Sequence, residues 1–122
     1  IETVAQCLAD AQSDPRFIPV GLYDGSCPIG FAMYGAFPHE TEHTRVWLDR
    51  FFIDKAYQGH GYGERFLTLL LSFLQEGYGC ARIYLSLYAD NVRAKALYEK
   101  HGFHLNGEVD PKGELLMVKI LS

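Results

Sequence analysis

Short apolar runs separated by polar turns characterise the first half of the chain. Residues 20–23, 29–34 and 45–53 each have the length and the apolar or aromatic content of a strand. Asp24-Gly25, between the first two runs, is typical of a tight hairpin turn. The third run is too apolar at its end for an edge position in a sheet. We therefore predict an antiparallel meander, in which the polar residues 38–44 separate the second strand from the third.

The second half alternates helices and strands. Apolar positions between residues 66 and 74 recur at helical spacing, and Gly77 and Gly79 follow as helix-ending residues. Asp90-Asn91 is suited to cap a helix. The predicted elements outside the meander are helices at 2–9, 66–74 and 92–101, the last ended by Gly102, and strands at 82–88, 103–105 and 115–120. This order indicates one mixed sheet with helices, of the α/β or α+β class.

Composition narrows the classes of function. The chain has 122 residues, 48% of them hydrophobic, which suffices for one core and a single domain over residues 1–122. It contains no apolar run long enough to span a bilayer and no secretory signal pattern, so we expect no membrane partner. The net charge of −4 argues against nucleic acid and favours a cationic partner. The widely spaced Cys7, Cys27 and Cys80 fit a reducing cytoplasm.

Three alternate glycines lie between the third predicted strand and the next helix. In the stretch QGHGYGER they are Gly59, Gly61 and Gly63. Glycines at this place let backbone N–H groups approach a ligand, and the positive end of the helix dipole favours an anion such as phosphate. The stretch lacks the Lys-Ser/Thr ending of a Walker loop and the last glycine of a dinucleotide-binding fingerprint. From spacing alone, a glycine-rich turn without a ligand is the alternative.

A second stretch adds context. Residues 91–103, NVRAKALYEKHGF, carry Asn, Ala, Tyr and Gly-Phe at fixed spacing. Together with the glycine stretch, these residues resemble the GNAT superfamily of N-acetyltransferases, and the resemblance covers the chain from Val20 onward. It implies a GNAT fold, whose mixed and mostly antiparallel central sheet is flanked by helices. It also implies transfer of the acetyl group of acetyl-coenzyme A to a primary amine by direct attack in a ternary complex, without a metal.

Within this superfamily, the chain resembles the bacterial spermine/spermidine (diamine) N-acetyltransferases. The similar segments are residues 19–23, 30–35, 46–54 and 106–119. This branch implies a polyamine acceptor, spermine or spermidine, and the frequency of oligomers in the family implies a possible homo-oligomer. The family begins with a strand and a helix that would precede Ile1. We therefore expect this domain to be incomplete at its N-terminus.

The resemblance also assigns a coenzyme site. The loop that holds the pyrophosphate corresponds to Gln58, Gly59, His60, Gly61, Tyr62, Gly63 and Glu64. Backbone groups of Phe51, Phe52 and Ile53 are expected to face the pantetheine arm, and an N–H at a splay in that strand is expected to polarise the thioester oxygen. Asn91 is expected to contact the coenzyme, to cap the following helix, or both.

Tyr98 is the candidate general acid that protonates the leaving thiolate. A thiol has a pKa of about 8.5 and a phenol a pKa of about 10, so the proton transfer costs little. The alternative is a core tyrosine that shares a buried helical stripe with Ala94 and Leu97.

The acceptor side is predicted to be acidic. Because an amine is protonated at neutral pH, some group must bind the ammonium or take its proton. The polyamine branch carries an acid at the position of Asp49, which we predict to be catalytic and substrate-binding. A surface carboxylate paired with Arg45 or Arg50 is the alternative. Glu40 and Glu42 on the adjoining loop are predicted to extend an acidic path for a polycation, unless they are only solvated.

Three other functions compete with polyamine acetylation. The segment from His39 to His43, HETEH, matches the H-E-x-x-H pattern of zinc metallopeptidases, which needs both histidines on one helical face. Pro38 and the flanking strands argue against a helix there, so we predict no metal site. A coenzyme A-binding module without turnover is the second alternative, and the presence of Tyr98 counts against it. The third is acetylation of another amine, such as a protein N-terminus, a lysine or an aminoglycoside.

Overall fold

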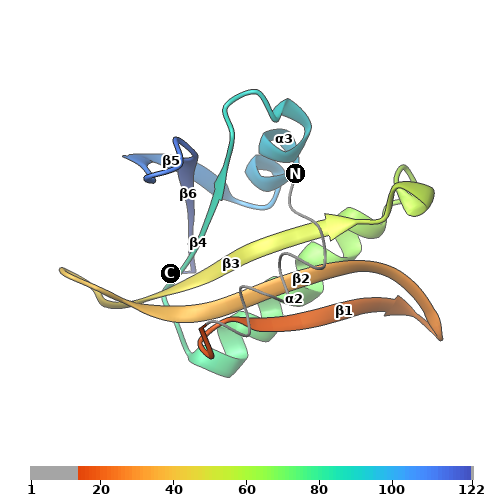
Figure 1. The fold of residues 1–122 in the computed structure, drawn as a ribbon, viewed down its shortest axis with the longest axis horizontal. Helices are drawn as coiled ribbons and strands as arrows, with labels where there is room; N and C mark the ends of the chain where they lie inside the picture. Colours follow the sequence, from red (N-terminus) through yellow and green to blue (C-terminus); the bar gives the residue numbers. More distant parts are fainter. Residues whose placement is uncertain (1–13, 122) are drawn as a thin grey trace.

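The antiparallel meander predicted for the first half is present (Figure 1). The computed structural model describes residues 14–121, so the helix predicted at residues 2–9 lies outside the described residues. The three strands of the meander are β1 (Ile18–Asp24), β2 (Cys27–His39) and β3 (His43–Ile53). The predicted turn joins the first two, because Asp24 pairs with Cys27.

The strands of the meander extend further than the apolar pattern predicts. Pro19 lies inside β1 and not in the preceding loop. It is tolerated because β1 is at the edge of the described sheet, where a strand can lack an N–H donor. The prediction that residues 38–44 separate two strands was wrong, because His39 pairs with His43 and only residues 40–42 form the turn. Backbone pairing continues there beyond the apolar core, so hydrophobicity does not mark its end.

The remaining elements complete a six-stranded sheet of the predicted mixed kind. They are the 3₁₀ turn η1 (Lys55–Tyr57), α2 (Tyr62–Tyr78), β4 (Arg82–Leu87), α3 (Val92–Lys100), β5 (Phe103–Val109) and β6 (Leu115–Ile120). The strand order is β1-β2-β3-β4-β6-β5. The β3–β4 pair is parallel and every other pair in this sheet is antiparallel. As predicted, β3 is an interior strand.

The two helices begin and end close to the predicted signals. The Asn91 side chain caps α3 by accepting a hydrogen bond from the Ala94 N–H at 3.3 Å, as predicted. α2 begins at Tyr62, before its first buried residue, and ends at Tyr78 with Gly79 as its C-cap, whereas Gly77 lies inside the helix and does not end it. Across the described part of the chain, neither helix is long and apolar enough to cross a membrane.

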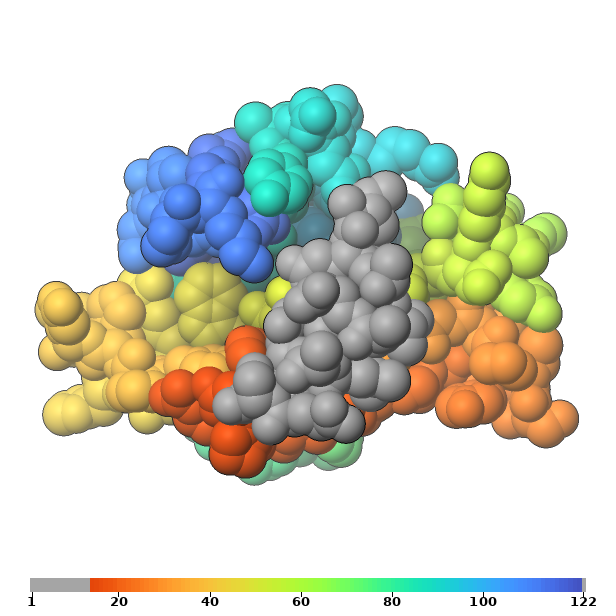
Figure 2. Space-filling view, in the orientation of Figure 1, coloured from red at the N-terminus to blue at the C-terminus, as the bar shows by residue number. Residues whose placement is uncertain are grey.

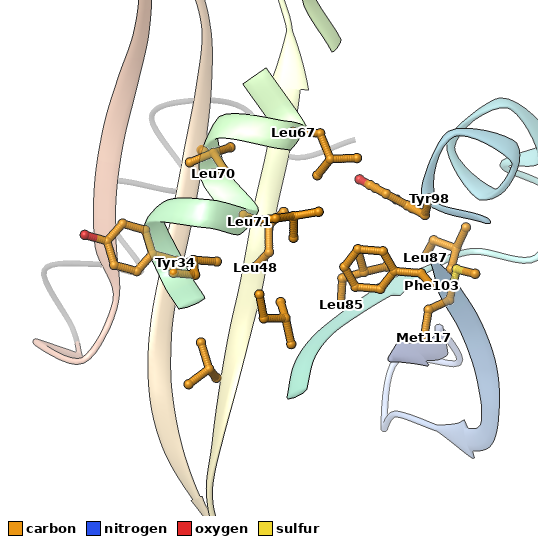
Figure 3. Packing of buried hydrophobic residues seen from close by; sticks show 14 of the residues in the cluster. Tyr34, Leu48, Leu67, Leu70, Leu71, Leu85, Leu87, Tyr98, Phe103 and Met117 are labelled. Carbon is orange, nitrogen blue, oxygen red and sulfur yellow. The ribbon is translucent and has the colours of Figure 1, made fainter. Parts of the chain in front are cut away.

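Both helices pack on the same face of the sheet and share one core. Leu67 of α2 and Tyr98 of α3 are buried in a cluster with Leu48 of β3 and Leu85 of β4 (Figure 3). The two helices also contact each other, through an ion pair of 2.6 Å between Lys100 and Glu64. The core therefore fixes α3 against α2 as well as against the sheet.

Two irregularities in β3 create the space for a site. The first is a splay: β3 pairs with β4 only at Val46↔Ile83 and Trp47↔Tyr84. The second is a bulge opposite the Met33–Tyr34 step of β2, where Met33 pairs with Arg50 and Tyr34 with Leu48. Asp49 is the additional residue.

A bulge of this kind turns two successive side chains to the same face of a sheet. Leu48 and Phe51 pack in the core below the helices, whereas Asp49 and Arg50 line a cavity together with residues outside that core. The bulge therefore directs a charged pair away from the helical face.

Candidate active site

A cavity of about 430 Å³ opens where β3 and β4 diverge. Figure 2 shows a hollow between the segment around η1 and the segment that leads into α3. The cavity is lined by Phe51, Phe52, Ile53, Tyr57, Gln58, Gly59, Gly61, Gly63, Glu64, Asn91, Arg93, Ala94, Leu97 and Tyr98. Every residue predicted to bind the coenzyme is in this set except His60 and Tyr62. The structure thus brings the glycine loop, the end of β3 and Tyr98 together around one space.

The glycine loop has the geometry of an anion site. Gly59 and Gly61 have φ angles of 83° and 81°, a region that other residues rarely adopt. A Cβ added at either position would meet no atom of the described residues within 4 Å, so both backbones face open space in this part of the chain. Gly61 is also the N-cap of α2, and no side chain caps that end of the helix. A phosphate group fits this place, because exposed N–H groups and the positive end of the helix dipole coincide there.

The first hairpin braces this loop through contacts that the sequence did not reveal. The Tyr62 hydroxyl donates a hydrogen bond of 2.7 Å to the Asp24 carboxylate. The Tyr57 hydroxyl lies 3.0 Å from the Cys27 sulfur. Tyr62 therefore acts from outside the cavity, as a support of the loop. The local signal for both contacts is the pair of tyrosines, Tyr57 and Tyr62, on either side of Gly59 and Gly61.

The side chains of the loop are held in place as well. The Gln58 amide donates to the Ile53 carbonyl at 2.9 Å, which ties the loop to the end of β3. Glu64 lies in the first turn of α2, where its charge would repel an anion. Lys100 pairs with it and holds its pKa below the usual range. Arg93, which the sequence analysis did not single out, adds a positive charge to the cavity wall.

Tyr98 lies at the apolar end of the same cavity. Its side chain is 9% exposed and meets the ring of Phe103 edge to face, with ring centres 5.8 Å apart. Its hydroxyl points toward Leu67 (Figure 3) and has no hydrogen-bond partner among the described residues. Burial raises the pKa of Tyr98 to about 12. The two interpretations of this tyrosine are thus compatible, since its ring is in the core and its edge lines the cavity.

Asp49 lines a different cavity, of about 420 Å³. The walls of this second cavity are Phe17, Phe37, Trp47, Asp49, Arg50, Ser86, Asp110, Lys112 and Glu114. Asp49 forms an ion pair with its neighbour Arg50, as the alternative interpretation expected. The second cavity begins on β3 next to the residues that line the first, so Asp49 and Tyr98 are on different sides of that strand. We call it the acceptor cavity below.

Glu40 and Glu42 do not lie beside Asp49. They belong to the turn at the tip of the β2–β3 hairpin, which projects to the left in Figure 1. The Glu42 carboxylate accepts a hydrogen bond of 2.6 Å from Tyr84 and pairs with Arg45 at 2.9 Å. Both contacts lower its pKa, with the Tyr84 hydrogen bond as the larger cause.

Arg45 is the centre of a buried ion network at this end of the sheet. It is 7% exposed, lies over the Tyr84 ring at 4.2 Å, and pairs with Glu108 at 2.9 Å as well as with Glu42. Tyr84 belongs to the last residue pair before β3 and β4 diverge. The network therefore fixes the closed end of the splay.

We expect Arg45→Met to lower the free energy of unfolding by about 1–3 kcal/mol at neutral pH, because two carboxylates lose a shared partner. The pKa values of Glu42 and Glu108 are lowered in the folded protein. Their contribution is thus present above the ordinary glutamate pKa and disappears as pH falls through the lowered values. Urea denaturation between pH 7 and pH 3 should show the difference between variant and parent shrinking with acid. Arg82→Met, which removes a cation 3.7 Å from Glu42, is the control and should have a smaller effect. A difference in unfolding free energy between Arg45→Met and the parent that did not depend on pH would contradict this account.

The metallopeptidase pattern has no helix to support it. His39 ends β2 and His43 begins β3, and the two residues pair across the hairpin. The His39 ring nitrogen also lies 3.3 Å from the Thr41 hydroxyl. Among the described residues, no group of three or more His, Cys, Asp or Glu side chains is arranged to hold a metal ion.

Comparison with known proteins agrees with the resemblance to the acetyltransferases. Residues 2–103 match the model of the acetyltransferase (GNAT) family. The chain is 49% identical to the spermine/spermidine N(1)-acetyltransferase of Bacillus subtilis (strain 168), and 50% identical to a protein of Bacillus subtilis subsp. natto described as "Probable spermine N(1)-acetyltransferase". Each alignment covers 99% of this chain and 82% of the relative.

A crystal structure of an acetyltransferase from Thermus thermophilus superposes with a TM-score of 0.75. It is 27% identical, and the match covers 98% of this chain and 76% of that one. The fold, the matched family model and the close relatives agree. The chain belongs to the acetyltransferase (GNAT) family and is an N-acetyltransferase that uses acetyl-coenzyme A.

Proposed function

We propose that this protein transfers the acetyl group of acetyl-coenzyme A to a primary amine of spermine or spermidine, by direct attack in a ternary complex. The observation that carries the proposal is the position of β3 between two cavities. Phe51, Phe52 and Ile53 line the cavity of the glycine loop, and Asp49 and Arg50 line the acceptor cavity. A donor and an acceptor can thus approach one strand from two sides. The identity with a spermine/spermidine N(1)-acetyltransferase supports the choice of amine.

The chain offers backbone groups along the whole length of the donor site. The N–H groups at the start of α2 would bind the pyrophosphate of the coenzyme, which supplies the acetyl thioester when bound. Beyond Trp47, β3 no longer pairs with β4. The backbone of that segment on its β4 side is therefore available to the pantetheine arm, and an N–H there can polarise the thioester oxygen. The bulge at Asp49 supports this role, because it interrupts the regular ladder at that level.

Tyr98 would donate a proton to the leaving thiolate. Its high pKa keeps the hydroxyl protonated throughout the neutral range, so a proton is available for transfer at every pH in that range. Burial that raises the pKa of Tyr98 also raises the pKa of a thiol that is released beside it. The difference in pKa between Tyr98 and the thiol is thus smaller than the raised pKa of Tyr98 alone would make it.

Asp49 would receive the amine. Its carboxylate can bind the ammonium or take the proton through a water molecule. Arg50 pairs with it in the structure, so an incoming ammonium competes with the guanidinium for the same oxygens. The half-buried setting of both residues strengthens this competition relative to that in water.

The test of the proposal is a panel of amines assayed by release of the coenzyme A thiol. Spermine and spermidine are expected to have the highest kcat/KM, above putrescine, a histone-tail peptide and an aminoglycoside. A preference for a peptide or an aminoglycoside would assign the protein to another amine class within its family. Failure of every amine to release thiol would favour a module that binds coenzyme A without turnover.

Asp49→Asn is expected to raise KM or lower kcat for spermine by about tenfold or more, and to affect a small monoamine much less. The variant removes the negative charge that attracts the ammonium groups of the acceptor, and a polycation loses more attraction from this than a monocation does. Kinetics at low and high salt check this expectation. Screening by salt should reduce the difference between the effect of Asp49→Asn on spermine and its effect on the monoamine. Glu99→Gln, an exposed change of the same charge on α3, is the control. Parental spermine kinetics at low salt would assign Asp49 to a surface ion pair.

We also propose a cytoplasmic location. The cysteines that the structure describes, Cys27 and Cys80, are both free thiols. Free thiols are typical of a reducing compartment.

A further inference from the structure

The acceptor cavity has an acidic wall beyond Asp49. Asp110 and Glu114, both half-buried, contribute it from the turn between β5 and β6. They are far from Asp49 in sequence, and the pairing of β4 with β6 brings them to the same cavity. Ser86, on β4, lies in the wall between them.

The turn is built to hold these carboxyl groups in place. One Asp110 oxygen accepts hydrogen bonds of 2.9 Å from the backbone N–H groups of Lys112 and Glu114. The Asp110 N–H in turn donates to the Glu114 carbonyl at 2.9 Å. Asp110 is therefore occupied with the turn. The Glu114 side chain forms no ion pair with the cations of the described residues, whereas Asp49 pairs with Arg50.

The wall also contains three aromatic side chains, beside the cations Arg50 and Lys112. Phe17 and Phe37 pack with ring centres 4.9 Å apart, and Trp47 packs against Tyr84. Aromatic faces attract alkylammonium groups and cover methylene chains. A wall of aromatic rings and carboxylates is suited to a flexible chain of alternating methylenes and charges.

On the basis of the proposed function, we propose that Glu114 determines the specificity for polyamines. It binds the distal ammonium group of the acceptor, while Asp49 receives the reacting amine. A monoamine has no second charge for Glu114, and so gains nothing from it. The carboxylate thus selects for acceptors with at least two positive charges.

The pKa of Glu114 in the free protein agrees with a site that binds a cation. Burial and the neighbouring Asp110 carboxyl raise the pKa of Glu114, and the nearby Lys112 and Arg50 only partly oppose this. A raised carboxyl pKa penalises the folded state above that pKa, and the penalty disappears below the ordinary glutamate value. We therefore expect Glu114→Gln to raise Tm at pH 7, with a gain that vanishes toward pH 4. Asp49, on β3, is the remaining titratable group of the cavity, and it is the same residue in the parent and in the Glu114→Gln variant.

The decisive experiment compares parent and Glu114→Gln with spermine, spermidine and propylamine as acceptors. We expect KM for spermine to rise roughly 10- to 100-fold, and KM for propylamine to change less than about threefold. Glu114→Asp keeps the charge and should recover part of the spermine affinity. Glu76→Gln, an exposed change of equal charge on α2, should leave all three acceptors unaffected.

The outcomes separate this inference from the proposed function. A parent enzyme that does not acetylate polyamines would overturn both. A parent that acetylates spermine, with a Glu114→Gln variant that keeps the parental ratio of spermine to propylamine kcat/KM, would overturn the inference alone. Equal losses for spermine and propylamine, together with a lower Tm, would assign Glu114 to the stability of the turn and would also reject it.

Discussion

Tyr98→Phe is expected to lower kcat by a factor of about 10²–10⁴ while it leaves coenzyme binding within about twofold. The substitution removes only the hydroxyl, and the ring keeps its edge-to-face contact with Phe103. The hydroxyl has no partner among the described residues, so its loss breaks no hydrogen bond in the free protein. A loss of turnover would therefore report on chemistry. Steady-state kinetics and calorimetry with coenzyme A provide the two measurements.

A matched control distinguishes the acid from a core tyrosine. Tyr34 is also buried, at 7% exposure, and packs edge to face against Phe73 on the far part of α2. Tyr34→Phe should leave kcat unchanged. If Tyr98→Phe turned over at the parental rate, Tyr98 would be a core residue and another group, or water, would protonate the thiolate.

The dependence of kcat on pH is a second test of Tyr98. Because burial raises the pKa of Tyr98 to about 12, the proton donor is present at every pH below that value. Deprotonation of Tyr98 should not limit kcat in the neutral range. A fall of kcat at low pH would then report on the amine or on the acceptor carboxylates, whose protonation weakens binding of the amine.

The order of the elements along the chain and the position of the glycine loop were predictable, because their signals are local. Alternation over a few residues predicts each strand, and the glycines of the loop precede the helix whose N-terminus they expose. Asn91, the cap, lies three residues before Ala94, from whose N–H its side chain accepts a hydrogen bond. Tyr98 follows one helical turn later. A local pattern is enough for such features, since every contact that defines them is short-range.

The acceptor cavity was not predictable in the same way, because it depends on register between distant segments. The bulge at Asp49 exists only through the pairing of β3 with β2. Arg45 reaches Glu108 across 63 positions, and Tyr84 reaches Glu42 across 42. Glu42 was therefore grouped with the substrate acids from its position in the chain, although the structure gives it cationic and phenolic partners. Charge composition predicts an acidic protein, and only the fold decides which carboxylates share a cavity.

Gly61→Val is expected to weaken coenzyme A binding by at least about 100-fold, from two separate effects. Gly61 has a φ of 81°, which costs a residue with a Cβ roughly 1–2 kcal/mol, so the loop would leave its anion-binding shape. The added side chain would also extend into the open space above the N-terminus of α2, because no atom of residues 14–121 lies within 4 Å of its Cβ. That is the space where a phosphate would accept hydrogen bonds from the loop.

Gly79→Val is the matched control, because it reproduces the strain without the site. Gly79 caps the other end of α2 with a φ of 59°, and its added Cβ also meets no atom within 4 Å in the part of the chain that the structure describes. Both variants should lose comparable stability by thermal denaturation, and only Gly61→Val should lose affinity by calorimetry. Parental affinity of both variants for coenzyme A would mean that the glycines serve the turn alone. Equal loss would mean that strain anywhere in α2 disturbs the site, and the phosphate contact would then have to be sought away from the loop.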